Sequence, residues 1–254
     1  MGYKRLPFEQ YFINSSEDYN RSGKTTRGLT YTALEYPCNG VLHRLTGMRH
    51  EVNFEIHWEP DREAIQINFE KTVGVSDWFA NVAESASKYY NAISFEGKPL
   101  QLLVHTGWAE MYLAAKRVIR RQWQLFHERH PEAETEIVGW SLGSGQAMLC
   151  AQDLNYNFGV RPHLFTYGSV RPFRGDGDND EALRQYLDTV CTECWNFSDV
   201  NDVISYMPPF RGWTAIRRVD VQSETRSALR LINPWKYHAH YDDPSLYEKI
   251  AEDI

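Results

Sequence analysis

The chain has 254 residues, 42% of them hydrophobic and 24% charged, which is the composition of a single ordinary globular domain spanning residues 1–254. No stretch approaches the roughly 18 apolar residues of a membrane-spanning helix, and the first residues lack the apolar core of a secretory signal peptide. The formal net charge of −7 favours solubility and argues against nucleic acid as a partner. Because no signal peptide is seen, we expect a cytoplasmic, cytosol-like compartment.

The first predicted elements are a polar loop and a β-hairpin. Residues 14–28 carry almost no apolar side chains, which predicts an exposed and flexible loop. Apolar and polar residues alternate over residues 52–56 and again over residues 65–69, on either side of turn-forming residues 59–62. This pattern predicts an antiparallel hairpin in the N-terminal part of the chain.

Strands alternate with helices from residue 100 to residue 200. Apolar runs and helical spacing predict strands at 100–105, 136–140, 163–167 and 195–197, and helices at 109–128, 141–154 and 180–190. This alternation is typical of βαβ units, so we expect an α/β fold with a mostly parallel central sheet flanked by helices. Ligands of such sheets bind beyond the carboxyl ends of the strands. A last helix is expected from Pro244 to Ile254.

The pentapeptide Gly139-Trp140-Ser141-Leu142-Gly143 stands between a predicted strand and a predicted helix. It matches the G-x-S-x-G pattern, and the strand–turn–helix setting is that of a nucleophile elbow. Glycines on both sides of the serine would let a tight turn pack against adjacent backbone. The turn would place the Ser141 hydroxyl at a helix N-terminus, with the N–H of Leu142 as the first oxyanion donor. The alternative is a helix N-cap serine in a glycine turn.

A serine hydroxyl is a poor nucleophile unless a histidine takes its proton and a carboxylate orients that histidine. In the elbow fold the order along the chain is serine, acid, histidine. Three histidines follow Ser141, and His163 opens a predicted strand soon after the nucleophile helix. The base is therefore expected to be His238 or His240.

At these residues the chain resembles the class 3 lipases, the family of fungal and plant triacylglycerol lipases and related esterases. The family patterns V-H-x-G-F, G-H-S-L-G, F-G-S-P-R and D-x-V-P-x-L-P-P have counterparts here at residues 104–108, 139–143, 167–171 and 201–209. The resemblance covers about residues 69–241, and the first 68 residues match poorly. It implies an α/β-hydrolase-type fold and a serine hydrolase that needs neither a cofactor nor a metal.

The resemblance also implies roles for single residues. Asp202 stands where the family has its catalytic acid, with Asp199 as a nearby competitor. The family's base often precedes a tyrosine by three positions, which favours His238, before Tyr241, and leaves His240 as the alternative.

The second oxyanion donor would be Thr72. It ends a block that the family writes F-R-G-T or F-R-G-S, and here the arginine and glycine are replaced by Glu70 and Lys71. The missing glycine predicts a different backbone geometry in this loop.

Several aromatic and apolar residues are expected near the substrate. His105 resembles a block histidine that lies beside the active site in the family, and its alternative is a strand-end histidine bonded for structure. Trp140 replaces the usual elbow histidine. Residues 76–82 stand where the family carries an amphipathic lid, or they form an ordinary core-packed helix. The apolar side of this segment consists of Trp78, Phe79 and Val82.

Two other patterns are expected to be structural. Cys191 and Cys194 form a lone C-x-x-C without the context of a zinc or redox site, so we expect reduced thiols. Arg117, Arg120 and Arg121 on the predicted 109–128 helix indicate a solvent-facing stripe.

The sequence thus predicts an α/β-hydrolase-type domain that cleaves carboxylic esters of lipids through an acyl-serine, with transient contact to a lipid surface. A phospholipase, a feruloyl-type esterase or an acyltransferase would carry the same triad. A catalytically silent binding protein could use the same scaffold, and the altered Glu70-Lys71 and Trp140 support this alternative.

Overall fold

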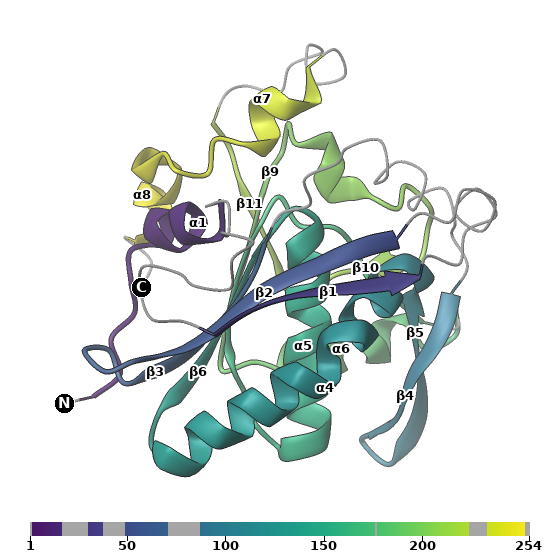
Figure 1. Cartoon of the computed structure of the whole chain (residues 1–254). Coiled ribbons are helices and arrows are strands. Elements are labelled where there is room, and N and C mark those ends of the chain that lie inside the picture. The colour runs from purple at the N-terminus through teal and green to yellow at the C-terminus, as the bar shows by residue number, and fades with distance from the viewer. Residues whose placement is uncertain are drawn as a thin grey trace.

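The structure is a computed structural model, and it describes residues 2–16, 30–37, 49–70, 87–175, 177–223 and 233–251. Two layers of helices enclose a central sheet, and a smaller sheet lies to one side (Figure 1). In the described part, no helix combines the length and the apolar character needed to cross a bilayer.

The central sheet has seven strands in the order β1-β2-β3-β6-β7-β9-β11. Their bounds are β1 (Thr30–Pro37), β2 (Arg49–Glu59), β3 (Ala64–Phe69), β6 (Glu134–Trp140), β7 (His163–Tyr167), β9 (Glu193–Asp199) and β11 (Arg218–Val221). Neighbours from β3 to β11 run parallel, whereas β1, β2 and β3 pair antiparallel. The predicted α/β class and mostly parallel sheet are confirmed, and the predicted hairpin is β2–β3.

The smaller sheet is antiparallel, in the order β10-β8-β5-β4. Its strands are β4 (Ser87–Phe95), β5 (Lys98–His105), β8 (Phe173–Arg174) and β10 (Trp213–Thr214). The prediction that residues 100–105 join the parallel sheet is wrong, because β5 pairs with β4 and β8. Glu96 and Gly97 both have positive φ, as a two-residue hairpin turn requires, so β5 finds its partner locally.

Three helices cover one face of the central sheet: α4 (Thr106–Arg129), α5 (Leu142–Phe158) and α6 (Asp180–Thr189). They correspond to the three helices predicted between residues 109 and 190. Alternate side chains of β3, β6 and β7, among them Ile67, Ile137 and Leu164, are buried in the apolar core on this side.

The opposite face is covered by the two ends of the chain. α1 (Phe8–Ser16) lies beside the 3₁₀ turn η3 (Pro244–Tyr247) and α8 (Glu248–Ala251), as Figure 1 shows. Phe8 packs against Tyr247 with ring centroids 5.5 Å apart. η1 (Val203–Tyr206) and α7 (Pro234–His238) are in contact with each other.

The predicted loop at 14–28 is wrong at its start, because residues 14–16 belong to α1. Phe8, Tyr11, Phe12 and Ser15 recur at helical spacing and are buried, and Asn14 is buried as well. Residues 17–28 lie outside the described residues. The predicted last helix begins instead as the 3₁₀ turn η3, and its last three residues are also outside.

A buried carboxylate fastens the N-terminal segment to β6. Glu136 receives two N–H groups of Arg62 at 2.7 Å each, the Tyr3 hydroxyl at 2.8 Å and the Gln66 amide at 2.7 Å. The Tyr11 hydroxyl donates to the same carboxylate. Burial and the charge of Glu136 raise the pKa of both tyrosines, so they remain hydrogen-bond donors.

Candidate active site

Ser141 occupies a strained turn between β6 and α5. Its backbone has φ 57° and ψ −123°, a conformation that non-glycine residues rarely adopt and that costs of order 1–3 kcal/mol. Its N–H donates to the carbonyl of Tyr167 at 2.9 Å, which holds the turn against the end of the neighbouring strand β7. The strand–turn–helix geometry predicted around Ser141 is therefore present.

Both glycines of the elbow are required by close backbone contacts. A Cβ atom on Gly139 would lie 2.5 Å from the carbonyl oxygen of Gly143. A Cβ atom on Gly143 would lie 2.7 Å from the Phe69 carbonyl oxygen and 2.8 Å from that of Glu70. The end of β3 and Glu70 therefore touch the elbow directly, as the need for small residues at 139 and 143 predicts.

The first turn of α5 reinforces this arrangement. The Ser144 hydroxyl donates to the Ser141 carbonyl and accepts the N–H of Val170 at 3.2 Å. Leu142 is the first helical residue, so its N–H lies outside the i→i−4 ladder of the helix. An anion beside Ser141 would meet this N–H and the positive end of the α5 dipole.

His238 and Asp202 form a buried hydrogen-bonded pair. Nδ1 of His238 donates to Oδ2 of Asp202 at 2.8 Å, and both side chains are fully buried. The other carboxylate oxygen, Oδ1, caps η1 by accepting the N–H of Ile204 at 3.0 Å. We call His238 and Asp202 the inner pair.

Tyr241 gives the inner pair another hydrogen bond. Its hydroxyl donates to Oδ2 of Asp202 at 2.9 Å. Burial and the negative charge of Asp202 raise the pKa of Tyr241 well above its usual value, so the phenol keeps the proton that it donates.

The inner pair lies against the elbow. The indole N–H of Trp140 donates to the carbonyl oxygen of His238 at 2.9 Å. A Cβ atom on Gly168 would lie 2.7 Å from the His238 ring and 2.8 Å from Oδ2 of Asp202. Gly168 directly follows Tyr167, whose carbonyl binds the Ser141 N–H. The same two-residue segment thus touches both Ser141 and the inner pair.

The hydrogen bond from Ser141 to His238 is not formed in this structure. Nε2 of His238 is buried and has no hydrogen-bond partner among the described residues. The candidate acid Asp202 is thus hydrogen-bonded to the candidate base His238. The other ring nitrogen of His238, Nε2, makes no hydrogen bond with a described residue.

The competing residues Asp199 and His240 bond to each other. Nε2 of His240 lies 3.2 Å from Oδ2 of Asp199, and the His240 side chain is 25% exposed. The structure therefore sorts the two candidate acids and two candidate bases into two separate pairs.

The loop after Asp202 is held by Arg171. Its guanidinium donates to the carbonyls of Tyr206 and Pro208, and its backbone N–H donates to that of Met207 at 2.8 Å. The sequence blocks 167–171 and 201–209 therefore meet in space. Sequence reasoning did not single out Arg171 or Gly168, although both lie in a block that it had matched.

His105 and Trp140, both predicted near the substrate, are buried. The His105 ring lies 4.3 Å from that of Trp108, which packs against the Gly145 position of α5. The Trp140 ring lies 5.6 Å from that of His238 and 5.1 Å from that of Phe12. The Trp108 ring thus lies between His105 and α5, whereas Trp140 is in direct contact with His238 of the inner pair.

The other predicted site residues lie outside the described residues. They are the second oxyanion donor and the apolar side of the lid segment: Thr72, Trp78, Phe79 and Val82. The described range 49–70 ends at Glu70, whose backbone carbonyl is in contact with Gly143.

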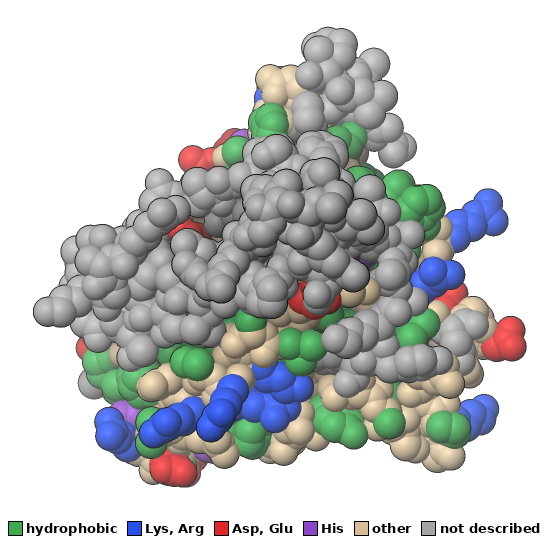
Figure 2. All heavy atoms as spheres, turned by 45° about the vertical axis from the view of Figure 1, so that its right-hand side comes forward, with side chains coloured by type: hydrophobic (Ala, Val, Ile, Leu, Met, Phe, Trp, Pro, Cys, Tyr) green, Lys and Arg blue, Asp and Glu red, His purple; other side chains and the backbone are tan. Residues whose placement is uncertain are grey.

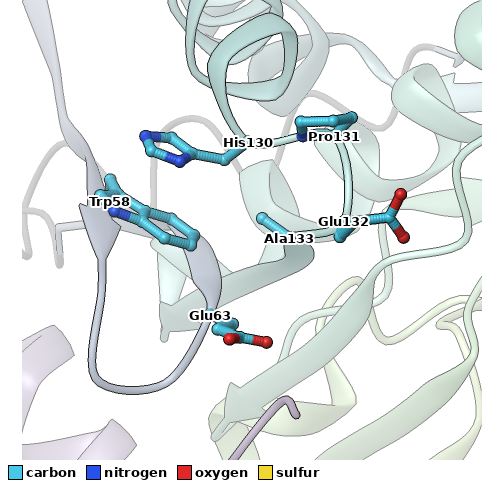
Figure 3. Close-up of a pocket in the computed structure, with 6 residues that line it drawn as sticks. All are labelled: Trp58, Glu63, His130, Pro131, Glu132 and Ala133. Carbon is cyan, nitrogen blue, oxygen red and sulfur yellow. The ribbon is translucent and has the colours of Figure 1, made fainter. Parts of the chain in front are cut away.

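Two surface hollows formed by described residues lie away from the elbow. The first has a volume of about 260 Å³ and is lined by Trp58, Glu63, His130, Pro131, Glu132 and Ala133 (Figure 3). It lies at the start of β6, whereas Ser141 follows its end, and the Trp58 and His130 rings stack 4.1 Å apart in it.

The second hollow, of about 420 Å³, lies along α4, where the sequence predicts an arginine stripe. It is lined by Leu113, Lys116, Arg117, Arg120, Arg121, Gln124 and Phe158. In Figure 2, a row of basic side chains crosses the lower part of the face of the molecule that is shown. Lys116 and Arg120 form ion pairs with the buried Asp153, at 2.8 Å and 2.6 Å, so two of these cations support the fold.

Cys191 and Cys194 are buried free thiols, and a hydrogen bond with Cys194, together with burial, raises the pKa of Cys191. Within the described ranges, no group of three or more His, Cys, Asp and Glu side chains is arranged to hold a metal ion.

The family model of class 3 lipases matches residues 67–212. This window contains Ser141 and Asp202, and His238 lies beyond it. A search of curated proteins found no match.

Solved structures of fungal lipases resemble the fold. A fungal lipase in complex with an inhibitor matches 67% of this chain and 61% of its own at 19% identity, with a TM-score of 0.56. A triacylglycerol lipase whose catalytic centre is a serine protease triad matches 76% and 66% at 17% identity, with a TM-score of 0.55. Lipase II from Rhizopus niveus matches 68% and 62% at 17% identity, with a TM-score of 0.54. The match thus spans less than two thirds of each of these three chains.

Proposed function

The chain belongs to the class 3 lipase family, and from this membership we propose that it hydrolyses carboxylic esters of lipids with Ser141, His238 and Asp202 as its triad. The observation that carries the proposal is the buried hydrogen bond between His238 and Asp202, set against the strained turn that holds Ser141. Strained backbone is characteristic of functional sites, where the surrounding structure maintains it.

The hydrogen bond to Asp202 determines which nitrogen of His238 is available. With Nδ1 donating to the carboxylate, Nε2 of the neutral ring has a free lone pair. Nε2 is therefore the atom that would take the proton of Ser141. Catalytic hydrogen bonds are often long without substrate and tighten in the complex, which accounts for the unformed contact between Ser141 and His238.

The reaction would proceed in two acyl-transfer steps. Ser141 Oγ attacks the ester carbonyl as its proton passes to Nε2 of His238, and His238 then protonates the leaving alcohol. Water, deprotonated by the same nitrogen, attacks the acyl-serine and releases the carboxylic acid. In both steps the Asp202 carboxylate stabilises the imidazolium.

The oxyanion would be stabilised at the start of α5. The Leu142 N–H is the proposed first donor, assisted by the positive end of the helix dipole. Thr72 is the proposed second donor, and support for it comes from the contact of Glu70 with Gly143, which brings the segment before Thr72 to the elbow.

The substrate side of the proposal rests on the family. We propose a lipid ester substrate, with Trp78, Phe79 and Val82 as a lid that makes transient contact with lipid. Since His105 and Trp140 are buried, we propose that they support the site from beneath rather than line an open pocket.

We also propose that residues 1–254 are one domain. The support is that Tyr3 and Tyr11 bond to Glu136 of the central sheet, and that Phe8 packs against Tyr247 near the other end of the chain.

The test is turnover of p-nitrophenyl esters from acetate to palmitate by the wild type and by Ser141→Ala, with fluorophosphonate labelling mapped by mass spectrometry. We expect labelling at Ser141 and loss of turnover in the variant. The preferred chain length then separates an esterase from a lipase. A folded protein that is neither labelled nor active would contradict the proposal and favour a binding protein on the lipase scaffold.

A further inference from the structure

A second carboxylate–imidazole pair lies beside the inner pair. Asp199, at the end of β9, and His240, just after α7, approach within 3.2 Å between Oδ2 and Nε2. We call these two residues the outer pair. The proposed mechanism gives them no role, although Asp199 is fully buried.

The environment of Asp199 is that of an ionised carboxylate. Oδ2 accepts the N–H of Ser223 at 3.0 Å and its hydroxyl at 2.6 Å, and Oδ1 accepts the N–H of Asn201 at 2.6 Å. Burial raises the pKa of Asp199, but the hydrogen bonds from His240, Ser223 and Asn201 outweigh burial and lower it. A negative charge is thus fixed beside the triad.

The hydrogen bonds of His240 require a protonated ring. Nε2 faces the Asp199 carboxylate, and Nδ1 lies 2.9 Å from the carbonyl oxygen of Lys236. Both partners can only accept, and a neutral imidazole has a single N–H to donate. The two contacts together are satisfied only by the imidazolium, so the outer pair carries one charge of each sign.

Other charged groups near His240 agree with this state. Burial lowers the pKa of His240, but the hydrogen bonds to Asp199 and to the Lys236 carbonyl, together with the charges of Asp199 and Asp202, raise it above its usual value. Hydrogen bonds with Ser245 lower the pKa of Asp243, and the charge of His240 lowers it further. From α7, the Lys236 ammonium lies 5.0 Å from the Tyr237 ring.

Tyr241 links the two pairs. Its hydroxyl accepts the backbone N–H of Asp199 at 2.9 Å and donates to Oδ2 of Asp202 at 2.9 Å. Its ring stacks on that of His240, with centroids 5.5 Å apart and planes at 21°. Because Tyr241 is fully buried, a charge on the outer pair acts on the inner pair through protein rather than through water.

We propose that His240 neutralises Asp199 and thereby limits the negative charge that acts on His238, which favours the form of His238 that can accept a proton. The inference rests on the proposed triad, and it makes the outer pair positioning residues for the catalytic base. If His240 lost its charge, the negative charge of Asp199 would stand alone. A nearby negative charge stabilises an imidazolium, so His238 would hold its proton to higher pH and would be unable to accept that of Ser141.

Three variants at the partly exposed position 240 separate charge from structure. His240→Gln keeps an N–H donor for Asp199 but removes the positive charge. His240→Lys keeps the positive charge on a side chain of different shape, and His240→Ala keeps neither the donor nor the charge. In each, kcat/KM for a short p-nitrophenyl ester is measured from pH 5 to 9, and the acidic limb of the profile is compared with that of the wild type.

We expect the acidic limb to move to higher pH by about half a unit in the Gln variant and to stay at the wild-type position in the Lys variant. The Ala variant should show the same displacement as Gln, with a lower kcat. If the role of His240 were purely structural, the acidic limb would lie at the same pH in the Gln and Lys variants. Equal profiles in these two variants would overturn the proposal.

His163→Gln is the matched control. Nδ1 of His163 bonds to Glu193 at 2.9 Å, which is also an imidazole–carboxylate pair, but His163 lies at the start of β7, the opposite end from Tyr167 and the elbow. This variant should leave the profile unchanged.

A second readout does not depend on turnover. In Ser141→Ala protein, the ring C–H signals of His238 are followed by NMR from pH 5 to 9, with and without His240→Gln. A higher titration midpoint in the Gln variant supports the coupling even if the protein hydrolyses no ester, in which case only the proposed function fails. An unchanged midpoint refutes the coupling whatever the activity.

Discussion

The indole N–H of Trp140 donates to the backbone carbonyl of His238 at 2.9 Å, so the residue before the candidate nucleophile holds the candidate base. The side chain is 8% exposed, and its ring packs between those of Phe12 and His238. The family writes histidine at this position, and here tryptophan provides a donor to the base segment.

Trp140→Phe should therefore lower kcat. Losing a hydrogen bond of about 0.5–1.5 kcal/mol that positions the base predicts a decrease of about 2- to 13-fold. Trp123→Phe is the control, because the indole of Trp123 is also buried and donates at 3.0 Å, but to Thr135 at the start of β6. Both variants should lose similar stability, and a comparable loss of kcat in Trp123→Phe would contradict the prediction.

Gly168→Ala should abolish most turnover. Gly168 has φ +53°, and the added Cβ would lie 2.7 Å from the ring of His238, which must then move. A misplacement of the base by about 1 Å predicts a loss of kcat of about 100-fold. Steady-state turnover and circular dichroism on the same sample separate a displaced base from an unfolded protein.

Gly159→Ala is matched to it. Gly159 has φ +69°, and a Cβ there would meet nothing within 4 Å, so this variant carries the backbone strain without the collision. It should cost about 1–2 kcal/mol of stability and leave kcat unchanged. Equal losses of activity in the two glycine variants would assign the effect to strain.

The outer pair should also make stability depend on pH. Burial lowers the pKa of His240, but the hydrogen bonds to Asp199 and to the Lys236 carbonyl outweigh burial and raise it above its usual value. The folded state therefore binds the proton more tightly than the unfolded state. This contribution is fully present below the unfolded pKa of about 6.5 and is lost as pH rises through the folded pKa.

Thermal unfolding of the wild type and His240→Gln from pH 5 to 9 measures this contribution. The wild type should have the higher Tm near pH 6, and the difference should shrink towards pH 9. The lowered pKa of Asp199 keeps its carboxylate ionised at pH 5, so the partner's charge is constant over this range. A difference that grows with pH would contradict the assignment of a protonated His240.

Glu136→Gln should destabilise the fold without changing the chemistry. The variant leaves the guanidinium of Arg62 without the carboxylate that now receives two of its N–H groups. Removing one partner of a buried pair typically costs 3–5 kcal/mol, about what urea unfolding should show. Glu181→Gln breaks the exposed pair with Arg184 and should stay within about 0.5 kcal/mol of the wild type. A loss below about 1 kcal/mol for Glu136→Gln would mean that Arg62 finds another partner.

The parts of the fold that could be predicted from the sequence are those specified by local patterns. β7 spans His163–Tyr167 as its apolar run predicts, and the elbow glycines are required by the close contacts expected of a tight turn. The sheet to which β5 belongs could not be predicted from its own residues, because an apolar strand can join either sheet. Its pairing with β4 in a hairpin determines that it joins the smaller sheet.

The candidate site shows the same division. Chain order left His238 and His240 open, and the resemblance selected Asp202 and favoured His238 without excluding His240, which is only two positions away. Only the directions of the two side chains at the end of α7 separate them. These directions depend on contacts with residues such as Asp199, about 40 positions away. α1 was missed, although Phe8, Tyr11 and Phe12 have helical spacing, because no capping residue marks its start.

The long-range anchors of α1 have a consequence for the order of assembly. The carbonyl of Phe8 accepts the hydroxyl of Tyr167, Arg5 pairs with Glu193, and Phe8 packs against Tyr247. During synthesis α1 emerges before the strands that it packs against, so it has no docking surface until β7 and β9 have been made. Contacts of such high sequence separation also form slowly. α1 is therefore made well before it can dock, and its docking contributes to the burial of Tyr167, whose carbonyl holds the Ser141 turn.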